Sequence, residues 1–400
     1  MSPYLDKAGI SSDVTGILSD KIAISSDTIG VPSDTTGISL DETAIFSDKT
    51  AISSDTTSIS SVKTGVPPNT KDSALWTILK LISWTDGYLK SFDIDSPRLT
   101  AEILLCHVLD IRRLDLYLQF DRPLNKNELA KYKSLIKRRV KKEPVAYITG
   151  IKGFWDSQFS VTPDVLIPRP DTEILVETTL ALIEYKRRRE SEVEIERKAK
   201  EDNAVENKEV KKIRVLELGT GSGAVIISLA RANPDILFYA TDISPQAIIV
   251  ARKNSFGVSS SDSVPLAGLT NLFFLTGSWF SPIKHGIKFD FIVSNPPYIP
   301  TDDIKSLQQE VRDYEPLLAL DGGHEGISCL RDIMESASDY LESDGVLLLE
   351  MGFDQKQKVE HEAVIISRYD TPEFLKDYAG HDRVVILRKK IKNIENKNKI

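Results

Sequence analysis

The residues best suited to chemistry form one short turn, Asn295-Pro296-Pro297-Tyr298, which follows the strand-like run 289–294. Two consecutive prolines remove two backbone donors and fix two φ angles, so the turn is stiff and its prolines only accept hydrogen bonds. The Asn295 side chain adds an amide oxygen and two amide hydrogens, and Tyr298 adds a flat ring. Such a turn is suited to hold a planar NH2 group, either an amide or an exocyclic base amine.

A second chemical feature is a glycine-rich loop directly before a helix, made of Gly219, Thr220, Gly221, Ser222 and Gly223. Glycines let a ligand approach the backbone, and the helix N-terminus offers free N–H groups to an anion such as a carboxylate. Glu217, just before the loop, can bind a cationic amine. Asp242 ends the next strand, where an acid accepts hydrogen bonds from a ribose diol. Amine, carboxylate and ribose together describe S-adenosylmethionine, whereas a dinucleotide favours G-x-G-x-x-G over the G-x-G-x-G found here.

The turn and the loop together predict the transfer of a sulfonium methyl group to nitrogen. Asn295 and the carbonyl of Pro296 would accept the N–H groups of the substrate, and Tyr298 would pack on its planar face. Most of the rate would come from positioning and electrostatics, so we expect no metal ion and no covalent intermediate. No histidine lies in these motifs to act as a base, and the proton can leave after transfer.

The elements that must position these residues alternate from residue 213 onward. Strand-like and helix-like stretches follow the order β-α-β-α-β-β-α-β-α, which predicts a doubly wound, mostly parallel α/β sheet with helices on both faces. The carboxyl ends of the strands line the ligand crevice in such a sheet, so the loop and the turn should meet there. We expect the methyltransferase domain over 213–390 and a tail over 391–400.

Residues 73–212 divide into three segments. Residues 73–143 show helical apolar spacing in three stretches, which predicts a small helical domain. Residues 144–185 contain an alternating stretch over 153–161, typical of a hairpin, and then a helical pattern from Thr172 to Tyr185. Residues 186–212 are dense in mixed charge, which is typical of a solvated helix extension or a flexible insert.

Residues 1–72 are a seven-residue repeat with Ile or Val at every seventh position from Ile10 to Val66. Only one strong apolar position occurs in each heptad, and Ser, Thr and Gly are poor helix formers, so a coiled coil is not favoured. One apolar stripe cannot bury enough surface to offset the entropy of ordering, and we expect a disordered segment. A binding stalk built from the repeat is the alternative.

Charge and cysteine content limit the class of protein. Residues 1–72 carry ten acidic and five basic side chains, so −5 of the net charge of −8 lies there and −3 in the remainder. A near-neutral folded part gives no global signal for nucleic acid. No apolar run is long enough to span a membrane. We interpret Cys106 and Cys329 as core thiols that form no disulfide. This favours a reducing compartment, and we expect a cytoplasmic protein.

These motifs resemble those of the N5-glutamine methyltransferases that modify peptide chain release factors, the HemK-like, PrmC-type enzymes. The resemblance covers about residues 73–390 and is carried by "EPVAYITG", "FWDSQFSVTPDVLIPRPDTE", "VLELGTGSGAV", "ATDIS", "GSWF", "SNPPYIP", "VRDYEPLLALDGGHEG", "LLLEMG" and "DYAGHDRVVI". It implies a class I S-adenosylmethionine-dependent methyltransferase fold, with donor contacts at Gly219–Gly223, Asp242, Trp279 and Asn295.

The same resemblance implies a substrate. The segment Asn295–Tyr298 would hold the glutamine in the Gly-Gly-Gln loop of class 1 release factors, and the N-terminal helical domain would help to grip that partner. The segment Pro168–Glu173, "PRPDTE", matches the release-factor branch of the family. Arg169, together with Asp171, is expected to organise the floor of the site, and Arg169 is a candidate substrate contact. Ser278 replaces the family's frequent Asp before the tryptophan. We expect a monomer.

Three alternatives stay open. A DNA adenine-N6 methyltransferase would use a similar turn for an exocyclic amine, but it needs a basic cleft and a target-reading domain for a flipped base. Glutamine methylation of a ribosomal protein is the second alternative. The third is an inactive S-adenosylmethionine-binding scaffold or a repeat-driven interaction protein, and the intact motifs argue against it.

Overall fold

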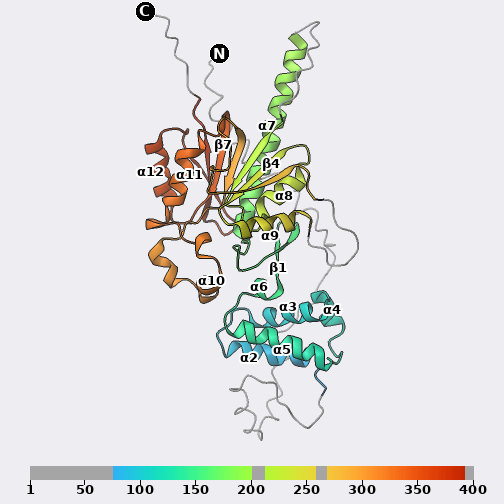
Figure 1. The fold of residues 1–400 in the computed structure, drawn as a ribbon. Helices are drawn as coiled ribbons and strands as arrows, with labels where there is room; N and C mark the ends of the chain where they lie inside the picture. Colours follow the sequence, from blue (N-terminus) through green and yellow to red (C-terminus); the bar gives the residue numbers. More distant parts are fainter. Residues whose placement is uncertain (1–74, 201–211, 258–267, 392–400) are drawn as a thin grey trace, which may run out of the picture. The chain divides into compact units, whose positions relative to one another are not determined.

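The computed structural model of the protein describes residues 75–200, 212–257 and 268–391. The chain divides between Thr149 and Gly150 into two compact units, a helical unit and an α/β unit (Figure 1). The predicted disordered repeat over 1–72 lies outside the described residues. None of the described helices has both the length and the apolar character that crossing a membrane requires.

The helical unit contains α2 (Ile78–Lys90), α3 (Pro97–Leu109), α4 (Arg113–Leu118), α5 (Lys126–Val140) and α6 (Val145–Thr149). Buried apolar residues of these helices form one core. The second predicted helical stretch is broken because Asp110 adopts a positive φ of 52° and ends α3. Glu102, only 1% exposed, accepts hydrogen bonds from Arg113 at 3.0 Å and Tyr117 at 2.6 Å, which fastens α4 to α3.

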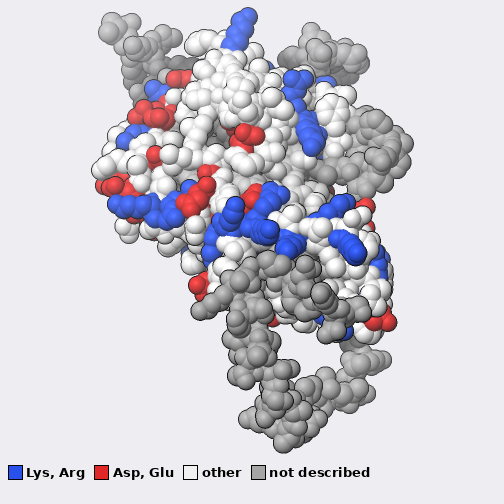
Figure 2. Space-filling model, turned by 60° about the horizontal axis from the view of Figure 1, so that its bottom comes forward, with Lys and Arg blue, Asp and Glu red and all other residues white. Residues whose placement is uncertain are grey.

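The surface charge is mixed rather than uniformly basic. The sequence of α5 is rich in Lys and Arg, but the Arg138 side chain pairs with Glu143 and Arg139 is buried, donating to the Glu143 carbonyl. Figure 2 shows Lys and Arg side chains with Asp and Glu side chains among them. The described residues in this view therefore carry both signs of charge.

The α/β unit is built on a seven-stranded sheet of β3 (Arg214–Leu218), β4 (Leu237–Asp242), β5 (Leu272–Thr276), β6 (Phe289–Ser294), β7 (Leu341–Glu350), β8 (Glu373–Lys376) and β9 (Asp382–Arg388). The strand order is β5-β4-β3-β6-β7-β9-β8. Strands β3 to β7 pair in parallel, and β9 is antiparallel to both of its neighbours. The predicted doubly wound, mostly parallel sheet is confirmed.

Helices cover both faces of this sheet (Figure 1). One face carries α7 (Glu173–Lys200) and α8 (Ala224–Ala232), with α9 (Pro245–Ser255) beside α8, and the other carries α11 (Ser328–Ala337) and α12 (Lys356–Ile366). Successive strand residues point to opposite faces, so Val293 joins the core under α8 and Ile292 joins the core under α11. Both faces are buried, which explains the almost continuous apolar run of β6.

The remaining elements agree with the sequence in part. The predicted hairpin is confirmed as β1 (Ile151–Phe154) paired with β2 (Ser157–Ser160). Helix α7 continues through the first half of the charged stretch, and 201–211 lie outside the described residues. The strands β8 and β9 were not predicted. Nor were the short helices η2 (Pro170–Thr172), η3 (Thr301–Ser306), α10 (Gln309–Tyr314), η4 (Leu317–Ala319) and η5 (His324–Gly326). The two cysteines are free, as expected.

A buried asparagine of α9 ties the hairpin to the glycine loop. The Asn254 side chain, 1% exposed, accepts from the Ser160 N–H at 2.8 Å. Its Nδ2 donates to the carbonyl oxygens of Ser160 at 3.0 Å and Ser222 at 2.8 Å. One side chain therefore satisfies three backbone groups from two segments that are distant in sequence.

We predict that Asn254→Ala lowers the free energy of unfolding by at least about 2 kcal/mol, because each buried group left unsatisfied costs about 1–3 kcal/mol. Urea denaturation followed by circular dichroism measures the change. Lys253→Ala, at the exposed neighbouring position, is the control and should shift stability by less than about 0.5 kcal/mol. Equal stability of the two variants would contradict the role of Asn254.

Candidate active site

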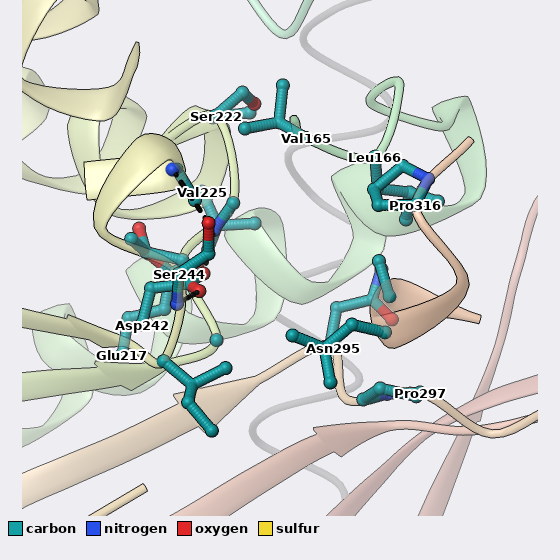
Figure 3. Close-up of a pocket in the computed structure, with 18 of the residues that line it drawn as sticks. Val165, Leu166, Glu217, Ser222, Val225, Asp242, Ser244, Asn295, Pro297 and Pro316 are labelled. Carbon is teal, nitrogen blue, oxygen red and sulfur yellow. Dashed lines mark hydrogen bonds between the residues drawn. The ribbon is translucent and has the colours of Figure 1, made fainter. Parts of the chain in front are cut away.

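The carboxyl ends of β3, β4 and β6 open onto one cavity of about 340 Å³ (Figure 3). The predicted residues that line it are Arg169, Glu217, Gly219, Thr220, Gly221, Ser222, Asp242, Trp279, Asn295 and Pro297. Three predicted residues lie outside this lining: Gly223 caps α8, Pro296 is buried, and the Tyr298 hydroxyl points to another side chain. The loop and the turn thus meet at one site, as the sheet topology requires.

The glycine loop needs its glycines for conformation and for space. Gly219, Gly221 and Gly223 have φ angles of 68°, 53° and 80°, in the left-handed region that side chains disfavour. A Cβ atom on Gly223 would also lie 2.7 Å from Ile227 Cδ1 and 3.1 Å from Ala251 Cβ. The loop therefore turns tightly and packs closely against α8 and α9.

Asp242 supports the same loop from the end of β4. Its Oδ2 accepts from the Gly221 N–H at 2.8 Å, and its Oδ1 accepts from the Ser244 N–H at 2.9 Å (Figure 3). A carboxylate has lone pairs beyond these two bonds. The acid predicted for a ribose contact thus also fixes the loop, a role that the sequence did not suggest.

Glu217 places a second carboxyl beside Asp242. Its side chain is 3% exposed and accepts from the Thr220 hydroxyl. Burial raises the pKa of Glu217 to about 8, the Thr220 hydrogen bond opposes this shift, and the Asp242 charge adds to it. Burial also raises the pKa of Asp242. Two buried acids that are costly to ionise form a site suited to a cationic ligand.

The Asn-Pro-Pro-Tyr turn is braced from behind by backbone and by one amide. Gln355 Nε2 donates to the Tyr298 carbonyl at 2.8 Å and to the Gly326 carbonyl at 3.0 Å. Gly326 has a φ of 72°, and a Cβ atom there would lie far inside contact distance of the Tyr298 carbonyl oxygen. The Gly322 N–H donates to the Ile299 carbonyl at 2.9 Å. The turn therefore has little freedom to shift.

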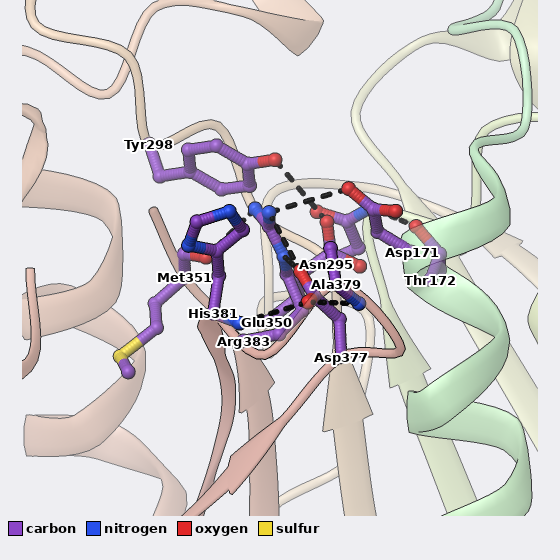
Figure 4. A network of polar contacts seen from close by, with 10 residues as sticks. All are labelled: Asp171, Thr172, Asn295, Tyr298, Glu350, Met351, Asp377, Ala379, His381 and Arg383. Atoms are coloured by element: carbon purple, nitrogen blue, oxygen red, sulfur yellow. Dashed lines mark hydrogen bonds and ion pairs between the residues drawn. The ribbon is translucent and has the colours of Figure 1, made fainter. Parts of the chain in front are cut away.

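The two polar side chains of the turn have partners within the protein (Figure 4). Asn295 Nδ2 donates to Thr172 Oγ1 at 3.0 Å, which engages the donor end of the amide and leaves its oxygen for a ligand. The Tyr298 hydroxyl donates to Glu350 Oε1 at 3.2 Å, and burial raises the pKa of Tyr298. Tyr298 thus braces the turn in this structure, and its packing on a substrate stays a prediction.

Arg169 is engaged in an ion pair. Its guanidinium binds the Glu315 carboxylate, which is 1% exposed and also accepts from the Ile167 N–H at 3.1 Å. Asp171 forms an ion pair with Arg383 at 3.2 Å. Both residues of the "PRPDTE" segment therefore anchor it to other parts of the unit, and a contact between Arg169 and substrate stays a prediction.

Thr172, Glu350, Gln355 and Asn254 were not identified from the sequence as residues that support the site. Glu350 carried a usable signal, because an acid after an apolar strand run is the pattern that singled out Glu217 and Asp242. Thr172 lies inside "PRPDTE", yet nothing local indicates its bond to Asn295. Gln355 and Asn254 carried no signal that spacing could reveal.

Known proteins resemble this chain over most of its length. The family described as the PrmC N-terminal domain matches residues 80–150, and the family described as a methyltransferase domain matches 209–368. The release factor glutamine methyltransferase of Geobacter sulfurreducens is 39% identical over 290 residues, covering 72% of this chain and 89% of that protein. The enzyme of the same name from Thermodesulfovibrio yellowstonii is 37% identical over 289 residues, covering 72% and 91%. A bifunctional methyltransferase of Rickettsia felis is 35% identical over 314 residues, covering 78% and 58%.

We predict that Glu217→Gln changes how stability of the ligand-free protein depends on pH. Folding raises the pKa of Glu217 from 4.5 to about 8. The protonated side chain therefore contributes its full stabilisation below pH 4.5, and this contribution is lost as the pH rises through about 8. The variant has no proton to lose at this position. Its free energy of unfolding should therefore rise relative to that of wild type between about pH 5 and pH 8.

Urea denaturation across this pH range measures the difference. Glu360→Gln, at an exposed position of α12, controls for the loss of one negative charge. If the Glu217→Gln and wild-type curves run parallel, Glu217 does not carry the buried proton assigned to it.

Proposed function

This chain belongs to the family of release factor glutamine methyltransferases, and we propose that it performs the family's reaction with the residues that line the cavity. It is a methyltransferase with S-adenosylmethionine as the methyl donor. The proposed acceptor is the side-chain amide nitrogen of the glutamine in the Gly-Gly-Gln loop of a class 1 release factor. The observation that carries the proposal is the amide of Asn295, whose oxygen is left for a ligand beside the glycine loop.

The residues at one end of the cavity fit the donor. The N-terminus of α8 would offer backbone N–H groups to its carboxylate, and the loop Gly219–Gly223, which is held by internal hydrogen bonds, would let the donor approach closely. Glu217, Asp242 and Trp279 line the same cavity, and in this proposal they bind the amine, the ribose and the adenine end of the donor. When bound, S-adenosylmethionine supplies an electrophilic sulfonium methyl group. The buried acids favour a cationic ligand, which supports this assignment.

The residues of the turn fit the acceptor amide. An amide nitrogen is a weak nucleophile because its lone pair is delocalised into the carbonyl group. Asn295 Oδ1 and the Pro296 carbonyl would accept its two N–H groups, which orients the nitrogen and shifts electron density toward it. No group of the turn needs to remove a proton before transfer, so positioning supplies most of the rate. Pro297 and Tyr298 complete the turn that holds these acceptors.

Membership of the family also helps to choose between the alternative substrates and to identify the protein partner. Relatives that align with about nine-tenths of their own length are named for release factors, which favours that substrate over DNA adenine or a ribosomal protein. We propose that the helical unit, which carries the match to the PrmC N-terminal domain, helps to grip the release factor. We also propose a monomeric enzyme that acts in the cytoplasm without binding DNA or a metal ion.

Incubation of the full chain with labelled S-adenosylmethionine tests the substrate. We predict that label enters a class 1 release factor, that it does not enter the variant with Gln→Ala in the Gly-Gly-Gln loop, and that duplex DNA stays unlabelled. Scintillation counting of the separated products measures the transfer. Label on DNA, or equal label on the release factor and its loop variant, would contradict the proposal.

Asn295→Ala tests the amide acceptor. We predict that turnover falls by about 100-fold or more, because a preorganised polar contact to the reacting group is lost. The affinity for S-adenosylmethionine, measured by calorimetry, should weaken by no more than about tenfold, or about 1.4 kcal/mol. Gln308→Ala, an exposed amide outside the cavity lining, is the matched control and should keep the wild-type rate. If Asn295→Ala keeps the wild-type turnover, Asn295 is not the acceptor for the substrate amide.

A further inference from the structure

A buried carboxyl lies directly behind the Asn-Pro-Pro-Tyr turn. Glu350 ends β7, the strand beside β6, and the pairing of Ser294 with Leu349 places Glu350 alongside Asn295. The Glu350 side chain is 1% exposed and lies outside the cavity lining. Burying a carboxyl group costs free energy unless other groups hydrogen-bond to it, so its partners indicate what it does.

Glu350 binds the tyrosine end of the turn, and Thr172 binds the asparagine end (Figure 4). The Tyr298 hydroxyl donates to Glu350 Oε1 at 3.2 Å. The Thr172 side chain lies close enough for hydrogen bonding to lower the pKa of Glu350, and Thr172 Oγ1 accepts from Asn295 Nδ2 at 3.0 Å. Glu350 Oε2 is buried without a hydrogen-bond partner among the described residues. The carboxyl therefore has acceptor capacity to spare beside Thr172.

The guanidinium of Arg383 lies nearby, but it does not explain why a carboxyl group is buried at position 350. Arg383 Nε and one terminal nitrogen each lie 3.1 Å from Asp377 Oδ2, and that same terminal nitrogen lies 3.2 Å from Asp171. Two other carboxylates thus hold the guanidinium. Burial raises the pKa of Glu350 to about 7, with Thr172, Arg383 and Tyr298 lowering it and Asp171 raising it. An acid in this position is not the ordinary partner of a buried arginine.

We propose that Thr172 and Glu350 are positioning residues, which fix the Asn295 amide and the Tyr298 ring for methyl transfer. An asparagine amide can turn by half a rotation and exchange its oxygen for its nitrogen. In this proposal the Thr172 hydroxyl donates a hydrogen bond to the Glu350 carboxylate, so it has only lone pairs to offer to Asn295. Thr172 then accepts from Nδ2 and keeps Oδ1 toward the substrate. The turned amide would face the N–H groups of the glutamine with its own donors.

This inference rests on the proposed function and deepens it. The Asn295 oxygen can accept from the substrate in only one of two amide orientations. We infer that the hydrogen-bonded residues around it, here called the device, select that orientation. The device spans three segments, because Thr172 comes from η2, Asn295 follows β6 and Glu350 ends β7. A fault in it should slow the transfer step and leave binding of both substrates nearly unchanged.

Thr172→Val and Thr172→Ser separate the hydroxyl from the packing. Valine keeps the shape and loses the acceptor, and serine keeps the acceptor with less volume. We predict that Thr172→Val lowers kcat by about 10- to 100-fold. KM for the release factor and Kd for S-adenosylmethionine should stay within about threefold, a change below about 1 kcal/mol. Thr172→Ser should recover most of the rate.

The matched control is Thr178→Val in α7. Thr178 is also fully buried, and its hydroxyl donates only to the Ile174 carbonyl of its own helix, at 2.7 Å. The same substitution there should keep the wild-type kcat. Thermal denaturation of all three variants distinguishes a loss of folded protein from a loss of positioning, since the variants should be compared where each is fully folded.

Glu350→Gln tests the second residue. The amide can still accept from Tyr298, but its NH2 group donates to Thr172, so the threonine hydroxyl is free to donate to a turned Asn295. We predict that kcat falls by about tenfold with KM nearly unchanged. Adding Glu350→Gln to Thr172→Val should cost little more, because both changes act on the same hydrogen-bond chain.

The outcomes distinguish the inference from the proposed function. If the wild-type protein labels the release factor and Thr172→Val does so at the same rate, the inference is wrong and the proposed function stands. A serine variant as slow as the valine variant would likewise reject it, because packing would then account for the loss. If the wild-type protein leaves the glutamine unlabelled, the proposed function and the inference both fail.

Discussion

Parallel pairing of four strands is the constraint on which the site depends. Strand β3 pairs with β4 and β6, and β6 pairs with β7, so their carboxyl ends meet at one edge of the sheet. That edge brings together Glu217, Asp242, Asn295 and Glu350 from positions far apart in the sequence. The three acids are buried there, and Asn295 is half-buried. The chemistry of the site follows from buried acids and one amide held at a single edge of the sheet.

The site has two ends with opposite requirements. At one end, Glu217 and Asp242 are buried acids, and a cationic ligand relieves the cost of ionising them. At the other end, the stiff turn presents acceptors, because the prolines lack N–H groups, one N–H of Asn295 donates to Thr172 and the Tyr298 hydroxyl donates to Glu350. The proposed cationic methyl donor and N–H-bearing acceptor would therefore occupy separate places in one cavity.

The sequence predicted these two ends because their residues are adjacent in the chain and carry strong local signals. Glycines before a helix permit backbone conformations that other residues disfavour, and prolines after a strand restrict the backbone, wherever they occur. The bond between Thr172 and Asn295 joins residues 123 positions apart, so no spacing rule could reveal it. Strand β9 was missed although 384–387 form an apolar run, because burial of both faces hides the alternation of a strand. Strand β8 has only four residues, none of them buried, which is too short for a pattern. The connection over 301–326 has no periodicity from which to predict its short helices.

The central claim is that the turn holds the glutamine amide through acceptors alone. A crystal structure of the chain with a class 1 release factor and the demethylated form of the donor tests it most directly. The account predicts that the glutamine nitrogen lies within about 3 Å of both Asn295 Oδ1 and the Pro296 carbonyl oxygen, with Asn295 Nδ2 still bound to Thr172. A glutamine that meets the nitrogen of Asn295, or that lies outside the cavity, would contradict it.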